Sequence, residues 1–254
     1  MDADLFWFSD EQWLKIERHL PTNQPGPKRH DDRRILSGIM HVQKVGCRWK
    51  DCPQAYGPRK TIYNRFARWS ERGVWQAIFA AVAAPAEPPE RVALDSSHVK
   101  VHRCASGGKG GPRPQAIGVT KGGRNSKIHA VVDEFCRPWA FVLTPGNTAD
   151  CVMAETCVSL IPGVSALVAD KGYDTDAFRR HLEQQGITSV IPGKSNRKTP
   201  IGFDKLAYRG RNVVERCFCR LKDFRRIATR YDKLARNFFS ALCFVATLAY
   251  WLDD

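Results

Sequence analysis

The run RVALDSSHVKV, residues 91–101, has the alternating pattern of a β-strand. Apolar side chains stand at Val92 and Leu94 and again at Val99 and Val101, as expected for a strand with one buried face. Two further strands are predicted downstream, and we expect them to pair as a hairpin: 127–133 and 139–144. The sequence from residue 91 onward therefore begins with three strands.

The rest of the chain alternates between helical and strand patterns. The expected elements are a helix over 149–160, a buried strand over 166–169, a helix over 174–185, a strand over 188–192, a loop over 193–207 and helix from about 208. Three strands followed by alternating helices and strands predict a mixed α/β sheet. This order matches the ribonuclease H-like fold, and it also matches several other α/β folds.

Residues 9–83 are predicted to form a small all-helical domain. Its third helix, which starts near Pro58, carries basic and aromatic side chains beside an apolar stripe: Arg59, Lys60, Tyr63, Arg65 and Arg68. Such a helix fits the recognition helix of a helix-turn-helix, and it equally fits a helical bundle with a solvated charged face. We expect this helical domain to span 1–84, a Pro-rich linker to span 85–90 and a second, mixed α/β domain to span 91–254.

The charge of the chain points to a polyanionic partner. Forty Lys and Arg against 26 Asp and Glu give a formal net charge of +14, which favours nucleic acid first and an anionic membrane surface second. The apolar segment 238–252 is interpreted as a buried C-terminal helix, so no membrane partner is expected. Nine cysteines without a C-x-x-C pair argue against zinc and fit a reducing cytoplasm.

Two acidic residues directly follow apolar runs. Asp95 follows Val92–Leu94, and Asp170 follows Leu167–Ala169. An acid at the end of a buried strand is well placed to bind a metal ion at the edge of a sheet, and Mg²⁺ prefers such oxygen ligands. Aspartate is also a common turn former at strand ends, so neither residue alone distinguishes the two interpretations.

A third acid, Glu215, lies in the predicted C-terminal helix. Tyr208, Arg211, Glu215 and Lys222 fall within an arc of roughly 60° on one face of a helix with 3.6 residues per turn. One acid bordered by two cations suits a metal ligand flanked by phosphate-binding groups. A solvated helix with an ordinary Arg211–Glu215 pair would have the same spacing.

The same residues carry a family resemblance. Tyr208, Arg211, Glu215 and Lys222 match the Y-(2)-R-(3)-E-(6)-K signature of insertion-sequence transposases. The stretches ADKGYD (169–174), GRNSKIHA (123–130), RNVVER (211–216) and CRWKDCP (47–53) also resemble the insertion sequence five family. The resemblance covers nearly the whole chain, with its motifs in order.

This resemblance implies a DDE transposase with a ribonuclease H-like catalytic domain. By position, its three metal-binding carboxylates fall on Asp95, Asp170 and Glu215. We expect them to bind two Mg²⁺ ions, for which Mn²⁺ could substitute. Tyr208, Arg211 and Lys222 would contact DNA at the site of cleavage. Further DNA contacts are expected from two residues of the 123–130 stretch, Arg124 and Lys127.

The predicted activity is cleavage of DNA strands at the terminal inverted repeats of an insertion sequence and joining of the 3′-hydroxyl ends to target DNA. Because two ends must be joined, we expect a homodimer or a higher oligomer on double-stranded DNA, in the cytoplasm and associated with the nucleoid. Two alternatives remain open at this point. One is a two-metal nuclease without joining activity, and the other is a DNA-binding regulator derived from a transposase.

Overall fold

The computed structural model describes residues 5–22, 29 and 31–252, which form two compact units. The helical unit comprises 1–85, 101–111 and 220–254, and the sheet unit comprises 86–100 and 112–219. These bounds differ from the expected division at 85–90. The C-terminal helices pack with the N-terminal helices, so the chain enters the sheet unit and returns from it.

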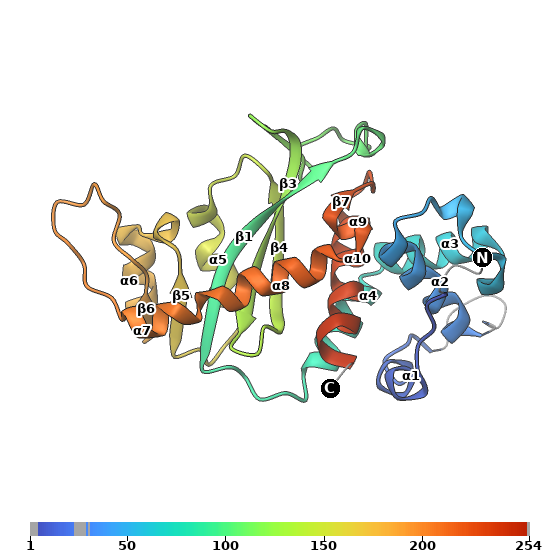
Figure 1. Ribbon diagram of the computed structural model, residues 1–254, viewed down its shortest axis with the longest axis horizontal. Helices are drawn as coiled ribbons and strands as arrows, with labels where there is room; N and C mark the ends of the chain where they lie inside the picture. Colours follow the sequence, from blue (N-terminus) through green and yellow to red (C-terminus); the bar gives the residue numbers. More distant parts are fainter. Residues whose placement is uncertain (1–4, 23–28, 30, 253–254) are drawn as a thin grey trace. The chain divides into compact units, whose positions relative to one another are not determined.

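A mixed β-sheet forms the centre of the sheet unit (Figure 1). Its strands are β1 (Arg91–Val101), β2 (Gly118–Thr120), β3 (Gly123–Asp133), β4 (Pro138–Pro145), β5 (Ala166–Ala169) and β6 (Thr188–Val190). The main path runs β2-β3-β1-β5-β6, and β4 pairs with β3 further along the same edge as β2. β1 is antiparallel to β3 and parallel to β5, as the predicted mixed sheet requires.

One face of the sheet packs against α5 (Ala154–Ser159) and α6 (Asp176–Gln184). Alternate strand residues supply this core, including Leu94 from β1 and Leu167 from β5, together with Phe178 from α6. Because successive side chains of a strand point to opposite faces, the residues between them face the other way. The 3-10 turn Arg209–Arg211, which precedes α8 (Asn212–Lys222), contacts β5.

The predicted elements are largely confirmed, with three differences. The Gly-rich stretch 104–123 contains β2, a strand that was not predicted, and its Gly118 pairs with Asn125 of β3. The helix expected over 149–160 begins as a 3-10 turn, Asp150–Met153. The continuous helix expected from 208 is divided into α8, α9 (Arg225–Ala228) and α10 (Ala235–Thr247), with the short strand β7 (Thr229–Arg230) between the last two.

The helical unit is built from α1 (Asp10–Glu17), α2 (Asp32–Val45), α3 (Arg59–Glu71) and α4 (Val74–Ala83), together with α9 and α10. Ser9 and Gln12 form a capping box at the start of α1, because the side chain of each accepts a hydrogen bond from the backbone amide of the other. One described helix, Ala235–Leu252, is long and apolar enough to cross a membrane. Its side chains are largely buried inside the protein (78% of the window), as expected for a core helix.

Trp75 joins the N-terminal helices to α10. Its side chain is fully buried, and its ring lies 4.5 Å from that of Phe244 and 5.1 Å from that of Trp69. The indole nitrogen donates a hydrogen bond to the backbone oxygen of Phe66 at 3.2 Å.

Replacing Trp75 with alanine is therefore expected to lower the free energy of unfolding by about 3–5 kcal/mol, because it leaves a large cavity between α4 and α10. Urea denaturation followed by circular dichroism measures this loss. Trp7→Ala is the control, because that side chain is 45% exposed. A loss at Trp75 no greater than at Trp7 would contradict this packing.

Candidate active site

Asp95 and Asp170 are neighbours on the sheet. Leu94 of β1 is the register partner of Ala169 of β5 in the parallel pair, and each aspartate is the next residue of its chain. The two carboxylates therefore extend from adjacent strands at the same level, on the face opposite the core residue Leu94. Asp170 follows the end of its strand, as predicted. Asp95 lies in the middle of β1, which continues to Val101, so its expected place at a strand end was wrong.

Arg211 connects Asp95 to Glu215. One terminal nitrogen of its guanidinium donates to Asp95 Oδ2 at 2.8 Å, and the other donates to Glu215 Oε1. The side chain of Glu215 is 54% exposed, whereas that of Asp95 is 19% exposed. Arg211 ends the 3-10 turn between α7 (Lys205–Tyr208) and α8, so the predicted single helix face is interrupted here. The two residues still meet because they lie four positions apart.

Burial raises the pKa of Asp95, and the nearby carboxylates of Asp170 and Asp150 raise it further. The backbone amide of Ser96 and the guanidinium of Arg211 act in the opposite direction. Although burial alone would lower the pKa of Arg211, the charges of Asp95 and Glu215 hold it above its ordinary value. The site therefore concentrates negative charge, and Arg211 balances part of it.

Asp150 is an acid of this site that the sequence analysis missed. Its Oδ1 accepts hydrogen bonds from Ser96 Oγ and Lys127 Nζ, each at 2.7 Å. Burial alone would raise the pKa of Asp150, but these two hydrogen bonds hold it below its ordinary value. Asp150 follows β4, which runs parallel to β1, so its place after a strand was the signal that could have identified it.

Lys127 has a different role from the predicted DNA contact. Its side chain is only 7% exposed, and its ammonium also donates to the backbone oxygen of Thr148 at 2.7 Å. A buried ammonium that is already bound to a carboxylate and a backbone oxygen is poorly placed to meet a phosphate. The prediction for Lys127 is corrected accordingly: this lysine neutralises Asp150 inside the sheet unit.

Nearby, His129 accepts or donates a hydrogen bond with Thr144 Oγ1 at 2.9 Å. Burial lowers the pKa of His129 to about 4. The ring is therefore neutral near pH 7 and adds no positive charge beside Asp150.

The donor chemistry of the site fits a hard divalent cation. Asp95, Asp150 and Asp170 all lie close enough to Tyr173 to raise the pKa of its hydroxyl, which burial raises most. The Tyr173 hydroxyl is buried and makes no hydrogen bond within the described part of the chain. Several carboxylate oxygens that lie close together are the kind of ligand that Mg²⁺ and Mn²⁺ prefer.

The carboxylates are not arranged around an ion as they stand. Across residues 5–22, 29 and 31–252, no three His, Cys, Asp or Glu side chains form a metal-binding group. The guanidinium of Arg211 stands between Asp95 and Glu215, in the place where a cation would satisfy both. Sharing an ion among the three predicted ligands therefore requires the Arg211 side chain to move aside.

The other residues predicted to contact DNA differ in exposure. On α3, Arg59, Lys60, Tyr63 and Arg68 are exposed, whereas Arg65 forms an ion pair with Asp32 and stacks over Trp69. Arg124 is exposed on β3. Tyr208 is half-buried, with its ring 5.4 Å from that of Phe203, and Lys222, also half-buried, is the last residue of α8. Arg65 is thus committed to holding α3 against α2.

Two protein families match the sequence over most of its length. Residues 8–79 match the family described as "Putative transposase of IS4/5 family". Residues 86–252 match the family described as "Transposase DDE domain". The residues between the two matches, 80–85, end where the Pro-rich stretch 85–90 begins.

Curated relatives match about half of the chain. An uncharacterised protein of Sinorhizobium fredii is 32% identical over 128 residues, which is 48% of this chain and 100% of that protein. A protein of Brucella ovis, named "Putative transposase for insertion sequence element IS6501", is 33% identical over 128 residues, 50% of this chain and 98% of that protein.

Among solved structures, the chain resembles the piggyBac transposase in a synaptic complex with hairpin DNA. The TM-score is 0.52 at 11% sequence identity, and the match covers 96% of this chain and 72% of that chain. At this identity the likeness concerns the fold. It agrees with the predicted ribonuclease H-like sheet preceded by helices.

Proposed function

The chain belongs to the transposase DDE domain family and is a DDE transposase of the insertion-sequence type, and from this we propose that it cuts and joins DNA at the ends of an insertion sequence. Its substrates would be the terminal inverted repeats of that element and a target duplex. Asp95, Asp170 and Glu215 would form the catalytic centre.

One observation carries this proposal. Asp95 and Asp170 follow register partners on adjacent parallel strands, and Arg211 bonds both Asp95 and Glu215. Asp170 thus lies next to Asp95 on the sheet, and Arg211 links Asp95 to Glu215, although the three acids are separated by 75 and 45 positions in the sequence. An ordinary solvated Arg–Glu pair on a helix would have no reason to involve a half-buried aspartate from the central strand.

The proposed reaction has two phosphoryl-transfer steps. In the first, the oxygen of water attacks a phosphorus at the end of the element, the bond from phosphorus to the 3′-oxygen breaks, and a 3′-hydroxyl and a 5′-phosphate result. In the second, that 3′-hydroxyl attacks a target phosphorus, and the target's own 3′-oxygen leaves with a proton. Each step exchanges one P–O bond for another, so no oxidant or reductant is needed.

The residues of this chain would mainly position and neutralise charge. Asp95, Asp170 and Glu215 would hold two divalent ions, Mg²⁺ or Mn²⁺. When bound, these ions supply Lewis-acid stabilisation of the attacking and leaving oxygens. Once released from its carboxylates, Arg211 would bind the scissile phosphate with its planar fork. Lys222 would add a second cation, and Tyr208 would stack on an unpaired base.

Recognition of the terminal repeat is proposed for α3. Arg59, Lys60, Tyr63 and Arg68 are exposed along this helix, which fits a helix that enters the major groove. Arg65 is left out of this surface because it is paired with Asp32. Arg124 remains a candidate for a further phosphate contact. Because two ends must be joined, we also propose assembly of at least a homodimer on DNA, with the nucleoid of the cytoplasm as its place of action.

A strand-joining assay tests the proposal. Duplexes copied from the DNA that flanks the gene, with pre-cut 3′-hydroxyl ends, are incubated with the protein, Mg²⁺ and a supercoiled target plasmid. The expected result is a covalently joined product that is absent with EDTA and absent with 3′-dideoxy ends. Cleavage of uncut ends without any joined product would instead identify a nuclease. Binding without cleavage or joining would identify a DNA-binding regulator.

A further inference from the structure

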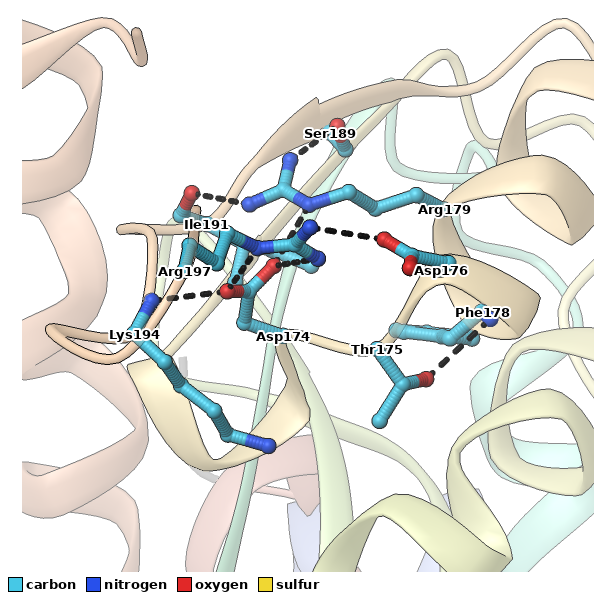
Figure 2. Close-up of polar contacts among 9 residues, drawn as sticks. All are labelled: Asp174, Thr175, Asp176, Phe178, Arg179, Ser189, Ile191, Lys194 and Arg197. Carbon is cyan, nitrogen blue, oxygen red and sulfur yellow. Dashed lines mark hydrogen bonds and ion pairs between the residues drawn. The ribbon is translucent and has the colours of Figure 1, made fainter. Parts of the chain in front are cut away.

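A buried carboxylate, Asp174, lies four residues after Asp170 and is only 3% exposed. Arg197 binds it through two parallel hydrogen bonds, Nε to Oδ2 at 2.6 Å and Nη2 to Oδ1 at 2.7 Å (Figure 2). The backbone amide of Lys194 donates to Oδ2 at 2.7 Å, and Arg179 Nε donates to Oδ1 at 2.7 Å. These hydrogen bonds hold the pKa of Asp174 well below its ordinary value, against the effect of burial.

Arg179 extends this network to the neighbouring strand. From α6 it also donates to the backbone oxygen of Ile191 at 2.7 Å and to Ser189 Oγ at 3.3 Å, just at the end of β6. Asp174 and Arg179 together therefore fix three segments to one another: the turn that carries Asp170, the end of β6, and the loop 193–204 that follows it. We call this set of contacts the Asp174 clamp.

The loop 193–204 is long for a connection without helix or strand. Loops of this length in compact proteins are usually either functional or disordered. Here, three donor groups of the loop bind one buried acid, so the loop is held in one conformation. Arg197 also pairs with Asp176 at 2.7 Å, which places both ends of its guanidinium on carboxylates. The ion pairs of Asp174 and Asp176 with Arg197 therefore help to set the shape of a surface loop.

The clamp leaves uncompensated charge on this loop. Arg197 is neutralised by Asp174 and Asp176, and the acid of the loop, Asp204, caps α7 through the amides of Leu206 and Ala207. Lys194 contributes its backbone amide to the clamp, while Figure 2 shows its ammonium extending away from Asp174. Lys198 is exposed. Both lysines line an open hollow of the surface together with Asn196 and Thr199.

We propose that loop 193–204, held by the Asp174 clamp, is a DNA-backbone contact surface beside the catalytic centre, with Lys194 and Lys198 as its phosphate-binding groups. The partner is duplex DNA, and the proposal rests on the proposed function. Lysine ammonium groups act as point charges, whereas bidentate base recognition typically uses arginine, asparagine or glutamine. The surface therefore binds phosphates of any sequence and positions the duplex relative to Asp170.

The clamp makes physical sense for such a surface. A loop that is already ordered loses less conformational entropy when it binds than one that must first be ordered. Because the same carboxylate fixes the turn after Asp170, the two lysines keep a constant position relative to that catalytic residue. A phosphate held by them would place the scissile bond reproducibly, which is what phosphoryl transfer requires.

The test is the salt dependence of DNA binding by the full chain. The probe is a fluorescent duplex of about 40 base pairs of arbitrary sequence, titrated by anisotropy over a range of NaCl concentrations without divalent metal. For Lys194→Ala with Lys198→Ala, the slope of log K against log salt is expected to become shallower by about 1.8, because two phosphate contacts are lost at about 0.9 each. The affinity loss should be the same for duplexes of different sequence.

Arg180→Ala is the matched control for the single variant Lys198→Ala. Arg180 is exposed on α6 and lies outside the clamp, so this variant removes the same charge without touching the loop. Its slope should equal that of the parent chain, while that of Lys198→Ala should fall by about 0.9. Equal slopes for the double lysine variant and the parent would overturn the inference. This readout does not need cleavage, so absence of joined product with an intact lysine effect would reject the proposed function alone.

Asp174→Asn tests the clamp itself. It keeps both lysines but removes the charge that orders the loop. Hydrogen exchange should become faster most strongly in residues 193–204, and DNA affinity should fall although no phosphate-binding group is lost. If Asp174→Asn is too unstable to purify, Arg197→Gln breaks the same pair from the exposed side. A flexible loop with unchanged DNA affinity would contradict a role for the clamp in binding.

Discussion

Replacing Asp170 with alanine is expected to reduce metal-dependent DNA strand cleavage by at least about 1,000-fold. The reason is that a carboxylate ligand of the proposed divalent ions is lost. DNA affinity measured without metal should stay within about twofold of the parent value, because the phosphate-binding cations are untouched. Radiolabelled duplexes resolved on denaturing gels measure cleavage, and anisotropy measures binding. The more conservative Asp170→Asn should lose cleavage to a similar degree, since the amide keeps the shape but not the charge.

Glu183→Gln provides the control for this loss. Glu183 is exposed on α6, so the variant removes one carboxylate from the same unit at a place outside the site. It should cleave like the parent chain. Asp170 also accepts a hydrogen bond from the amide of Gly172 at 2.8 Å, so thermal unfolding of each variant must be compared with the parent. A folded Asp170→Ala variant that still cleaves with Mg²⁺ would remove Asp170 from the catalytic centre.

Arg211→Ala is expected to change metal binding and cleavage in opposite directions. In the described structure, the guanidinium bonds Asp95 and Glu215, so it competes with a cation for both carboxylates. Its removal should tighten Mn²⁺ binding about tenfold, which corresponds to about 1.4 kcal/mol. Cleavage should nevertheless fall about 100- to 1,000-fold, because the scissile phosphate loses a bidentate charged donor.

Calorimetric titration with Mn²⁺ measures the first effect, and the cleavage assay measures the second. Arg180→Ala again removes one positive charge elsewhere in the sheet unit, so it separates a local effect from a change in net charge. Arg211→Lys should recover part of the cleavage, since lysine keeps the charge but lacks the planar fork. Weaker Mn²⁺ binding in Arg211→Ala would show that Arg211 supports the metal site rather than competing with the ion.

Much of the fold could be read from local patterns. The strand over 91–101 and the buried strand over 166–169 agree with the structure to the residue. The first has an alternating apolar pattern and the second is a continuous apolar run followed by Asp170, so the information lies within a few neighbouring positions. The short strand β2 was missed because three residues carry no period, and only pairing with Gly123–Asn125 defines it.

Part of the candidate site could likewise be predicted from the sequence, and part could not. Asp95, Asp170 and Glu215 were selected by their sequence context and by the motif around Tyr208 and Arg211. The sequence did not reveal Asp150, whose partners Ser96 and Lys127 lie 54 and 23 positions away. The sequence also did not show that Lys127 and Arg65 are paired with acids and shielded from solvent. A buried and an exposed lysine or arginine look alike in a sequence.

By itself, the sequence determined the family and the order of most strands and helices, and it supplied the prediction that Asp95, Asp170 and Glu215 are the catalytic acids. The tertiary structure decided which charges are paired: Lys127 with Asp150, Arg211 with Asp95 and Glu215, and Arg197 with Asp174. The physical reason is the separation in the sequence between the residues that interact. Strand and helix periods arise between residues a few positions apart, whereas an ion pair depends on which distant segments the sheet brings within a few ångströms and removes from water.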